Sequence, residues 1–224
     1  NLEYLKLDKP PLIDDFFDNI HQWINGRNLN DFRVHLINKL TRDISLPPKI
    51  YQLAKSHIHW LVGNELAMQR SCNLSIQIPQ DSSSLLPLHS DVWSGNSPYE
   101  IVLWFPFVNC YRTKSMFVLP KYETDRITSH FSDYASMNAE DLFHQIQDQL
   151  HWLEVPYGHG VIFTHALLHG NRINEEDQTR WALNIRFKAL LSPYGDKELG
   201  ESFIPVTIRP MTRMGYHYKK TTLR

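Results

Sequence analysis

The first 70 residues carry the hydrophobic pattern of helices. Between Asp14 and Gly26, apolar side chains recur mostly at the three- and four-residue spacing of a helix that buries one face. The same spacing predicts a second helix around Phe32–Thr41 and, after the Pro47-Pro48 break, a third from about Ile50 to Met68. We therefore expect a helical N-terminal layer over residues 1–70.

After residue 70 the pattern changes to that of short strands. Polar and apolar residues alternate along 73–78, and further strands are predicted within 99–110, 115–120, 151–158, 160–170, 180–191 and 202–210. A polar, helical insert interrupts them at about 122–150. Helices followed by many short strands predict a mostly β fold, a double-stranded β-helix (jelly roll, cupin-like) with flanking α-helices. The length fits a single domain over 1–224, with the jelly-roll core at 71–224.

Composition narrows the class of protein. The formal net charge is -1 at pH 7, which lacks the basic field of a nucleic-acid or membrane-surface binder. No apolar run reaches the roughly 20 residues of a membrane span, and no secretory leader is visible. The two cysteines, Cys72 and Cys110, fit buried thiols in a reducing compartment. We expect a cytoplasmic protein, and composition alone does not indicate its chemistry.

Candidate chemistry begins with an H-x-D motif at His89 and Asp91. On a strand, residues at this spacing leave the same face, so an imidazole and a carboxylate can bind one metal ion. A further histidine would complete a two-histidine, one-carboxylate set, which suits Fe(II) because it leaves positions open for a cosubstrate and O2. Alone the motif is weak, since a chain with 12 histidines offers about one chance occurrence.

A second signal lies in the segment 167–187. One strand ends at His169, and another starts at Arg180, whose alternation places Arg180, Asn184 and Arg186 on one face. Inward-facing arginines need anionic partners because an unpaired buried charge is costly. A carboxylate of a cosubstrate could serve, because it matches the guanidinium with two hydrogen bonds, and ordinary salt bridges are the alternative.

The order of these motifs resembles a known superfamily. H-x-D, a long gap, His169 followed by Gly-Asn, and Arg180 eleven residues later is similar to the Fe(II)/2-oxoglutarate-dependent dioxygenases of the phytanoyl-CoA-hydroxylase type. Within it, the segments 88–120 and 180–218 resemble the StrG-like oxygenases of sporadic carbohydrate-biosynthesis clusters. The resemblance covers roughly residues 69–218.

This resemblance implies a dioxygenase that uses Fe(II), 2-oxoglutarate and O2. The metal ligands, and hence the catalytic residues, would be His89, Asp91 and His169, with Arg180 gripping the far carboxylate of 2-oxoglutarate. The substrate would be a sugar or sugar derivative of carbohydrate or aminoglycoside-type biosynthesis. Asp91 favours hydroxylation or another oxidation, because related halogenases have a small residue in its place. The oligomeric state stays open, with a homodimer as one outcome.

Other inward-facing polar and aromatic residues are expected around the small molecules. The candidates for cofactor binding, besides Arg180, are Gln77, Asn184 and Arg186. The candidates for substrate binding are Asn73, Trp93, Asn96, Trp104 and Lys114. Aromatic and amide groups suit a polyhydroxylated ligand, although each residue could equally be a core aromatic or a solvent-facing strand residue.

Several alternatives stay open. His165 could replace His169 as the distal ligand by spacing alone, but it lacks the following Gly-Asn, so we expect a supporting or packing role. His57 and His59 have ligand-like spacing but lie in a predicted helix, where residues two apart diverge, and His159 fits a turn between glycines. The alternative function is a non-oxidative jelly-roll protein, either a metal-dependent sugar isomerase or a carbohydrate-binding protein.

Overall fold

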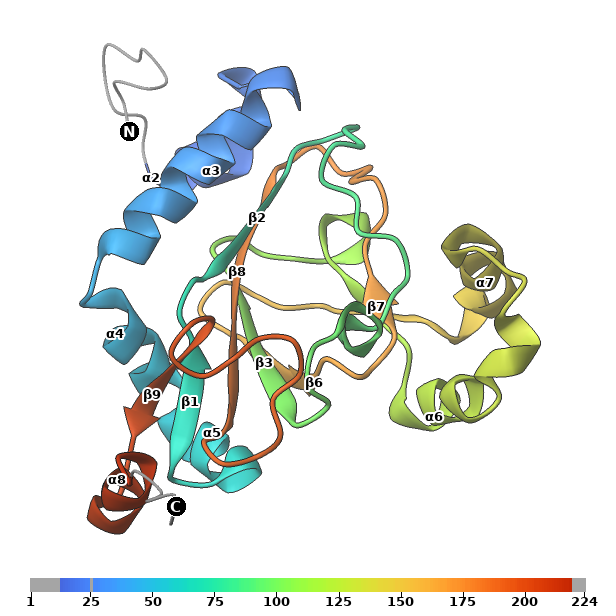
Figure 1. Cartoon of the computed structure of the whole chain (residues 1–224). Helices are drawn as coiled ribbons and strands as arrows, with labels where there is room; N and C mark the ends of the chain where they lie inside the picture. Colours follow the sequence, from blue (N-terminus) through green and yellow to red (C-terminus); the bar gives the residue numbers. More distant parts are fainter. Residues whose placement is uncertain (1–12, 25, 219–224) are drawn as a thin grey trace.

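Figure 1 shows a computed structural model of the chain, which describes residues 13–24 and 26–218. A six-stranded antiparallel sheet forms its centre, and a three-stranded antiparallel sheet lies across from it. The strands of the larger sheet are β1 (Leu66–Gln69), β2 (Asn73–Gln77), β3 (Glu100–Pro106), β6 (Val161–Thr164), β8 (Arg180–Ala189) and β9 (Phe203–Thr207). Those of the smaller sheet are β4 (Phe117–Val118), β5 (His151–Trp152) and β7 (His169–Gly170).

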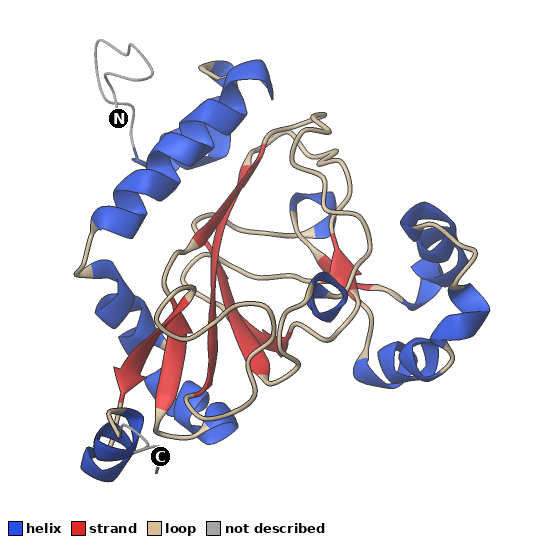
Figure 2. Ribbon diagram, viewed as in Figure 1, coloured by secondary structure: helices blue, strands red, loops and turns tan. Residues whose placement is uncertain are grey.

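Helices cover both ends of this arrangement, as Figure 2 shows. On one side lie α2 (Ile13–Asn19), η1 (Ile20–Gln22), α3 (Gly26–Arg42), α4 (Leu46–Leu53) and α5 (Lys55–Val62). On the other lie α6 (Lys121–Ser129), η4 (Phe131–Tyr134), α7 (Ala139–Ile146) and η5 (Gln147–Gln149). The remaining helical turns are η2 (Asp91–Ser94), η3 (Arg112–Lys114) and α8 (Pro210–Tyr216).

Strand β8 organises the core, because it pairs with β3 on one edge and with β2 and then β1 on the other. Its outward residues Leu183, Ile185 and Phe187 pack against α4 and α5, while Trp181 packs against α3. Its inward face points toward the smaller sheet, where Ala182 packs in a cluster with residues of both sheets. The alternation predicted for this strand is confirmed.

Three expected elements are different in the structure. The helix predicted up to Met68 ends at Val62, and residues 66–69 form β1, because hydrogen bonds to β8 and β9 outweigh the local pattern. His89 makes only an isolated bridge, and Asp91 opens η2, so the H-x-D motif does not lie on a regular strand. The strand predicted within 202–210 is shorter, because β9 ends at Thr207 and Pro210 begins α8.

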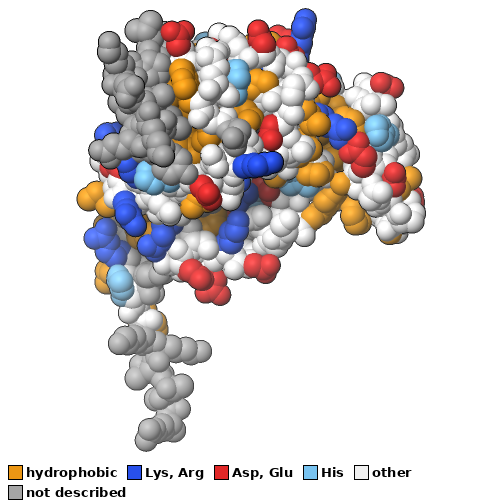
Figure 3. Space-filling model, turned by 90° about the horizontal axis from the view of Figure 1, so that it is seen from above, with side chains coloured by type: hydrophobic (Ala, Val, Ile, Leu, Met, Phe, Trp, Pro, Cys, Tyr) orange, Lys and Arg blue, Asp and Glu red, His pale blue; other side chains and the backbone are white. Residues whose placement is uncertain are grey.

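Three other expectations at this level are met. The helical insert is present as α6 to η5, Cys72 and Cys110 are buried free thiols, and antiparallel sheets are flanked by helices. Across the described ranges, no helix is both long and apolar enough for a membrane span. Basic and acidic side chains lie interspersed on the face that Figure 3 shows.

Candidate metal centre

Three predicted ligands meet between the two sheets. His89 and His169 exchange both backbone hydrogen bonds, each 2.9 Å long, and the Asp91 amide donates to the His165 carbonyl at 3.1 Å. This pairing brings one ligand atom each of His89, Asp91 and His169 within 4.8 Å of one another. Of the described histidines, cysteines and acidic residues, these are the ones grouped closely enough to hold a metal ion, and His165 is not among them.

The close approach of segment 86–87 to the chain after His169 explains why glycine and asparagine follow this histidine. Segment 86–87 passes so close that a Cβ at Gly170 would lie 2.7 Å from the Leu86 carbonyl oxygen. The Asn171 side chain then accepts a 2.7 Å hydrogen bond from the Leu86 amide. The His-Gly-Asn sequence therefore fastens β7 to the segment that carries His89.

Both histidines are turned so that Nε2 is available. Nδ1 of His89 donates to the Pro87 carbonyl at 2.7 Å, and Nδ1 of His169 donates to the Leu167 carbonyl at 2.8 Å. A carbonyl oxygen only accepts, so each Nδ1 carries the hydrogen and Nε2 keeps its lone pair for a metal. Nε2 of His89 lies 3.7 Å from Oδ1 of Asp91, a separation that a shared ion can bridge.

The protonation of the triad also suits a cation. Burial would raise the pKa of Asp91, but the nearby imidazoles of His165 and His89 and the Arg186 charge outweigh it and hold the pKa well below its usual range. Burial and the nearby His89 lower the pKa of His169 to about 4. Burial lowers the pKa of His89 too, yet the nearby Asp91 carboxylate and the hydrogen bond to the Pro87 carbonyl leave it above its ordinary value.

Arg180 lies beside this triad without a carboxylate partner among the described residues. It is 2% exposed and donates to the Ser115 carbonyl at 2.8 Å and to Ser75 Oγ at 2.9 Å, while its buried Nε has no partner. Burial lowers the pKa of Arg180 to about 10, so the side chain stays charged at neutral pH. A buried cation of this kind is suited to binding an anion, because an anion would supply the charge that the described residues do not.

A cavity of about 60 Å³ joins Arg180 to all three predicted ligands. It lies between the two sheets, because its walls come from β2, β3, β6 and β8 on one side and β7 on the other. Its other lining residues are Ser75, Leu86, Val102, Trp104, Met116, Phe163, Gly170, Asn171 and Asn184.

Two further candidates line this cavity, and two lie next to its walls. Trp104 and Asn184 are lining residues. The Asn73 amide donates to Asn184 Oδ1 at 2.9 Å and so supports it from the neighbouring strand. Gln77 is fully buried beyond the cavity wall, where its amide donates to the Arg172 carbonyl.

The remaining candidates are placed elsewhere. Lys114, expected to contact substrate, is fully buried in an ion pair with Asp18 and does not line the cavity. Trp93 is 43% exposed and packs on Phe131, with ring centroids 5.1 Å apart.

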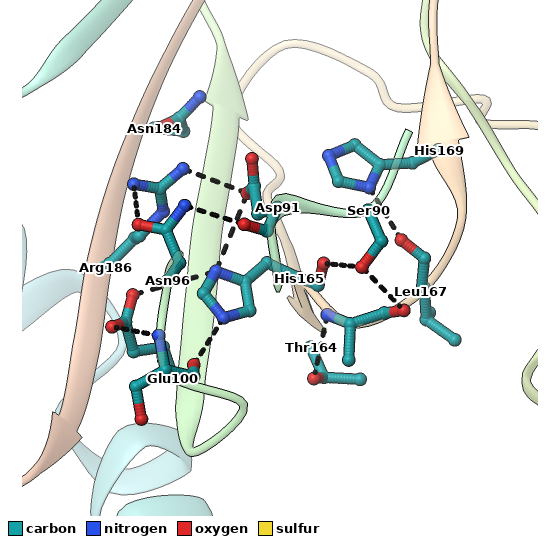
Figure 4. A network of polar contacts seen from close by, with 12 residues as sticks. Ser90, Asp91, Asn96, Glu100, Thr164, His165, Leu167, His169, Asn184 and Arg186 are labelled. Atoms are coloured by element: carbon teal, nitrogen blue, oxygen red, sulfur yellow. Dashed lines mark hydrogen bonds and ion pairs between the residues drawn. The ribbon is translucent and has the colours of Figure 1, made fainter. Parts of the chain in front are cut away.

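Arg186 and Asn96, expected near cosubstrate and substrate, both contact Asp91, as Figure 4 shows. Arg186 Nη2 donates to Asp91 Oδ2 at 2.9 Å, and the Asn96 amide donates to the Asp91 carbonyl at 2.9 Å. His165 is also behind Asp91, fully buried, in the supporting place expected for it. His57 and His59 lie in α5, and His159 lies in the loop between β5 and β6, as predicted.

Glu100 is a site residue that the sequence reasoning missed. It is 1% exposed, and its Oε2 lies 3.6 Å from His165 Nδ1. The signal was present, because Glu100 opens an otherwise apolar strand, and a buried carboxylate needs a nearby partner.

Comparison with known proteins gives a likeness at the level of the fold. No family model matches the sequence, and no curated protein matches it. The solved structure of apo ThoJ, a non-haem monooxygenase, aligns with a TM-score of 0.51 at 15% identity, covering 68% of this chain and 58% of ThoJ. Apo HygX from Streptomyces hygroscopicus aligns with a TM-score of 0.51 at 11% identity, covering 75% of this chain and 79% of HygX.

The chain thus spans less than two thirds of the ThoJ length. Identities this low leave the chemistry to be argued from the site itself. What the two alignments contribute is that this chain shares its fold with ThoJ and HygX.

Proposed function

We propose that this chain is an Fe(II)- and 2-oxoglutarate-dependent dioxygenase with a double-stranded β-helix core. One observation carries the proposal: Arg180, a buried cation with no carboxylate partner among the described residues, lines the same small cavity as His89, Asp91 and His169. A metal site alone would not call for that cation. A cosubstrate that binds the metal at one end and presents a carboxylate at the other would use both.

The roles of the residues follow from their surroundings. Nε2 of His89, Oδ1 of Asp91 and Nε2 of His169 would hold the iron, because Nδ1 of each histidine is occupied by a carbonyl. Arg180 would bind the far carboxylate of 2-oxoglutarate, with Ser75 and the Ser115 carbonyl orienting its guanidinium. Iron with 2-oxoglutarate and O2 supplies a two-electron oxidation, in which a substrate C–H becomes C–OH while 2-oxoglutarate becomes succinate and CO2.

The proposed substrate is a small polar metabolite, a sugar or a sugar derivative. The sequence resemblance to carbohydrate-cluster oxygenases is the main support. Trp104 and Asn184 add an aromatic face and an amide to the cavity wall, the kinds of group that bind hydroxylated rings. From the composition of the chain, with its two buried cysteines, we also propose that the protein acts in the cytoplasm.

The direct test is succinate formation by the purified protein. We expect succinate when Fe(II), 2-oxoglutarate and O2 are all supplied, even with no substrate present, as slow uncoupled turnover. His89→Ala and Asp91→Ala should reduce it to background, because each removes a metal ligand. His57→Ala, on the exposed side of α5, is the matched histidine control and should keep the wild-type rate.

Two results would contradict the proposal. In one, the protein binds Fe(II) but neither binds nor consumes 2-oxoglutarate. In the other, Zn(II) or Mn(II) supports a sugar isomerisation without O2, and Arg180→Ala leaves it intact. The second result would establish the non-oxidative alternative.

A further inference from the structure

Asp91 is fastened by both its side chain and its backbone. Arg186 Nη2 donates to Oδ2 at 2.9 Å, and the Asn96 amide donates to the Asp91 carbonyl at 2.9 Å. Arg186 Nη1 reaches Asn96 Oδ1 at 3.4 Å, so the three residues close a ring, visible in Figure 4. Arg186 comes from β8 and Asn96 from the turn after η2, so the ring connects the larger sheet to the metal-binding segment.

The two carboxylate oxygens of Asp91 therefore have different surroundings. Oδ2 accepts a hydrogen bond from Arg186, and His165 Nδ1 also lies 3.6 Å from it. His165 is itself held, because its Nε2 donates to the Ser97 carbonyl at 2.6 Å. Oδ1 is the oxygen that lies 3.7 Å from Nε2 of His89, on the side of the other ligands.

Arg186 is unsuited to the cosubstrate role that its strand position suggested. It is 8% exposed, both of its terminal nitrogens are engaged, and it does not line the cavity that contains Arg180. Its partner is a residue of the metal site itself. The two arginines on this face of β8 therefore differ in their surroundings: Arg180 lines the cavity, whereas Arg186 contacts Asp91.

We propose that Arg186 is a positioning residue that occupies Oδ2 of Asp91 and leaves Oδ1 alone for the metal. Asn96 assists by holding both the guanidinium and the Asp91 backbone. The inference rests on the proposed function only in requiring a divalent metal at His89, Asp91 and His169, and it does not depend on the cosubstrate. Its consequence is that a carboxylate using one oxygen leaves more of the metal's positions open than one using two.

Two hypotheses about Arg186, that it positions Asp91 or that it acts only through its charge, predict opposite changes in metal affinity when the residue is replaced. A cation near the site repels a divalent metal, so if charge were all that mattered, Arg186→Met would raise metal affinity. If Arg186 orients Asp91, the same variant should lose about 10- to 100-fold in affinity, the usual effect of removing a group that orients a ligand. Arg186→Lys keeps the charge but loses the two-pronged geometry, so it should also bind metal more weakly than wild type.

The experiment titrates the full-length protein with Mn(II) and records the affinity together with water proton relaxation. Relaxation by bound Mn(II) reports the number of water molecules on the ion. We expect Arg186→Met to lower both the affinity and the relaxivity, the latter by about a third, as Asp91 replaces one of three waters with its second oxygen. Arg126→Met, which removes an exposed arginine paired with Glu123 on α6, is the matched control and should change neither.

The outcomes separate this inference from the proposed function. Unchanged or higher affinity in Arg186→Met, with unchanged relaxivity, overturns the inference while wild-type succinate formation still supports the function. If Mn(II) binding depends on Arg186 but the protein does not turn over 2-oxoglutarate, the inference stands and the proposed function is overturned. No Mn(II) binding by the wild-type protein overturns the inference, and the absence of succinate with Fe(II) and 2-oxoglutarate would overturn the proposed function as well. Should Arg186→Met fail to fold, Asn96→Ala tests the same ring and should lower both readouts to a smaller extent.

Discussion

Arg180 is a residue whose placement costs the ligand-free protein stability. Its charge is buried with no carboxylate partner in the described part of the chain, and its two hydrogen bonds, to a carbonyl and to a hydroxyl, compensate only part of the desolvation. Such a residue makes sense where a ligand supplies the missing charge. Function and stability are therefore expected to conflict at this position.

Arg180→Met tests that conflict. Because an apolar side chain of similar length removes the buried charge, the free energy of unfolding without ligands should stay the same or rise by about 1 kcal/mol. In the same variant, 2-oxoglutarate should no longer stabilise the metal-loaded protein, whereas it should stabilise wild type. Urea denaturation with and without 2-oxoglutarate measures both effects. A loss of more than about 2 kcal/mol without ligand would instead make Arg180 a structural residue.

The family resemblance, and not spacing alone, named the three residues that the structure groups together, and neither predicted their separate roles. The resemblance rests on the H-x-D motif and the His-Gly-Asn sequence, while alternation along β8 placed both arginines on the inward face. Which arginine meets Asp91 depends on how the segment around His89 pairs with β7, a contact between residues 80 apart in sequence. No local pattern encodes that geometry.

At the scale of elements, Lys114 anchors α2 to the body of the protein. The lysine, in η3, is fully buried and donates to Asp18 of α2 at 2.7 Å and to Gln178 at 2.9 Å. The carbonyl of Asp18 accepts a further hydrogen bond from the Thr179 amide. Asp18 is therefore connected both to Lys114 and to the segment just before β8 that contains Gln178 and Thr179. Lys114, which the sequence suggested as a substrate contact, therefore forms an ion pair that connects distant segments.

Lys114→Met should loosen this fastening. It leaves the Asp18 carboxylate without its cation, and we expect a loss of about 2–3 kcal/mol in unfolding free energy, below the full value for a buried pair because Asp18 is partly exposed. Adding Asp18→Leu should recover most of the loss, since no unpaired charge then remains. Denaturation of both variants, with hydrogen exchange of α2, gives the measurement. Equal losses in the single and double variants would mean that the ion pair does not hold α2.

Local patterns predicted the elements best where an element is long or capped by its own residues. The insert is recovered because Asn138 caps α7 through a capping box. β1 was assigned to a helix because four residues carry too little periodicity, and their strand state comes from β8 and β9 on either side. Asp91 opens η2 rather than extending a strand, which a two-residue spacing cannot reveal.

At the scale of the whole molecule, the candidate centre depends on the complete fold. The candidate ligands come from the bridge residue His89, from the start of η2 and from the short strand β7. The residues that contact Asp91 come from the larger sheet and from the turn after η2. Unfolding separates all of these segments, so a metal bound through all three ligands should bind the folded chain far better than the unfolded one. Metal binding and global stability are then linked.

This linkage gives a test that needs neither substrate nor cosubstrate. At a free Mn(II) concentration about 100 times its dissociation constant, binding to the folded state alone adds about 2.7 kcal/mol. For a chain of this size that corresponds to a rise in Tm of roughly 5–10 °C. Thermal unfolding with Mn(II), and again after a chelator, should show the rise and its reversal in wild type and in His57→Ala. His89→Ala should show little of it, because it lacks one ligand of the triad. The same rise in His89→Ala would place the stabilising metal somewhere other than between His89, Asp91 and His169.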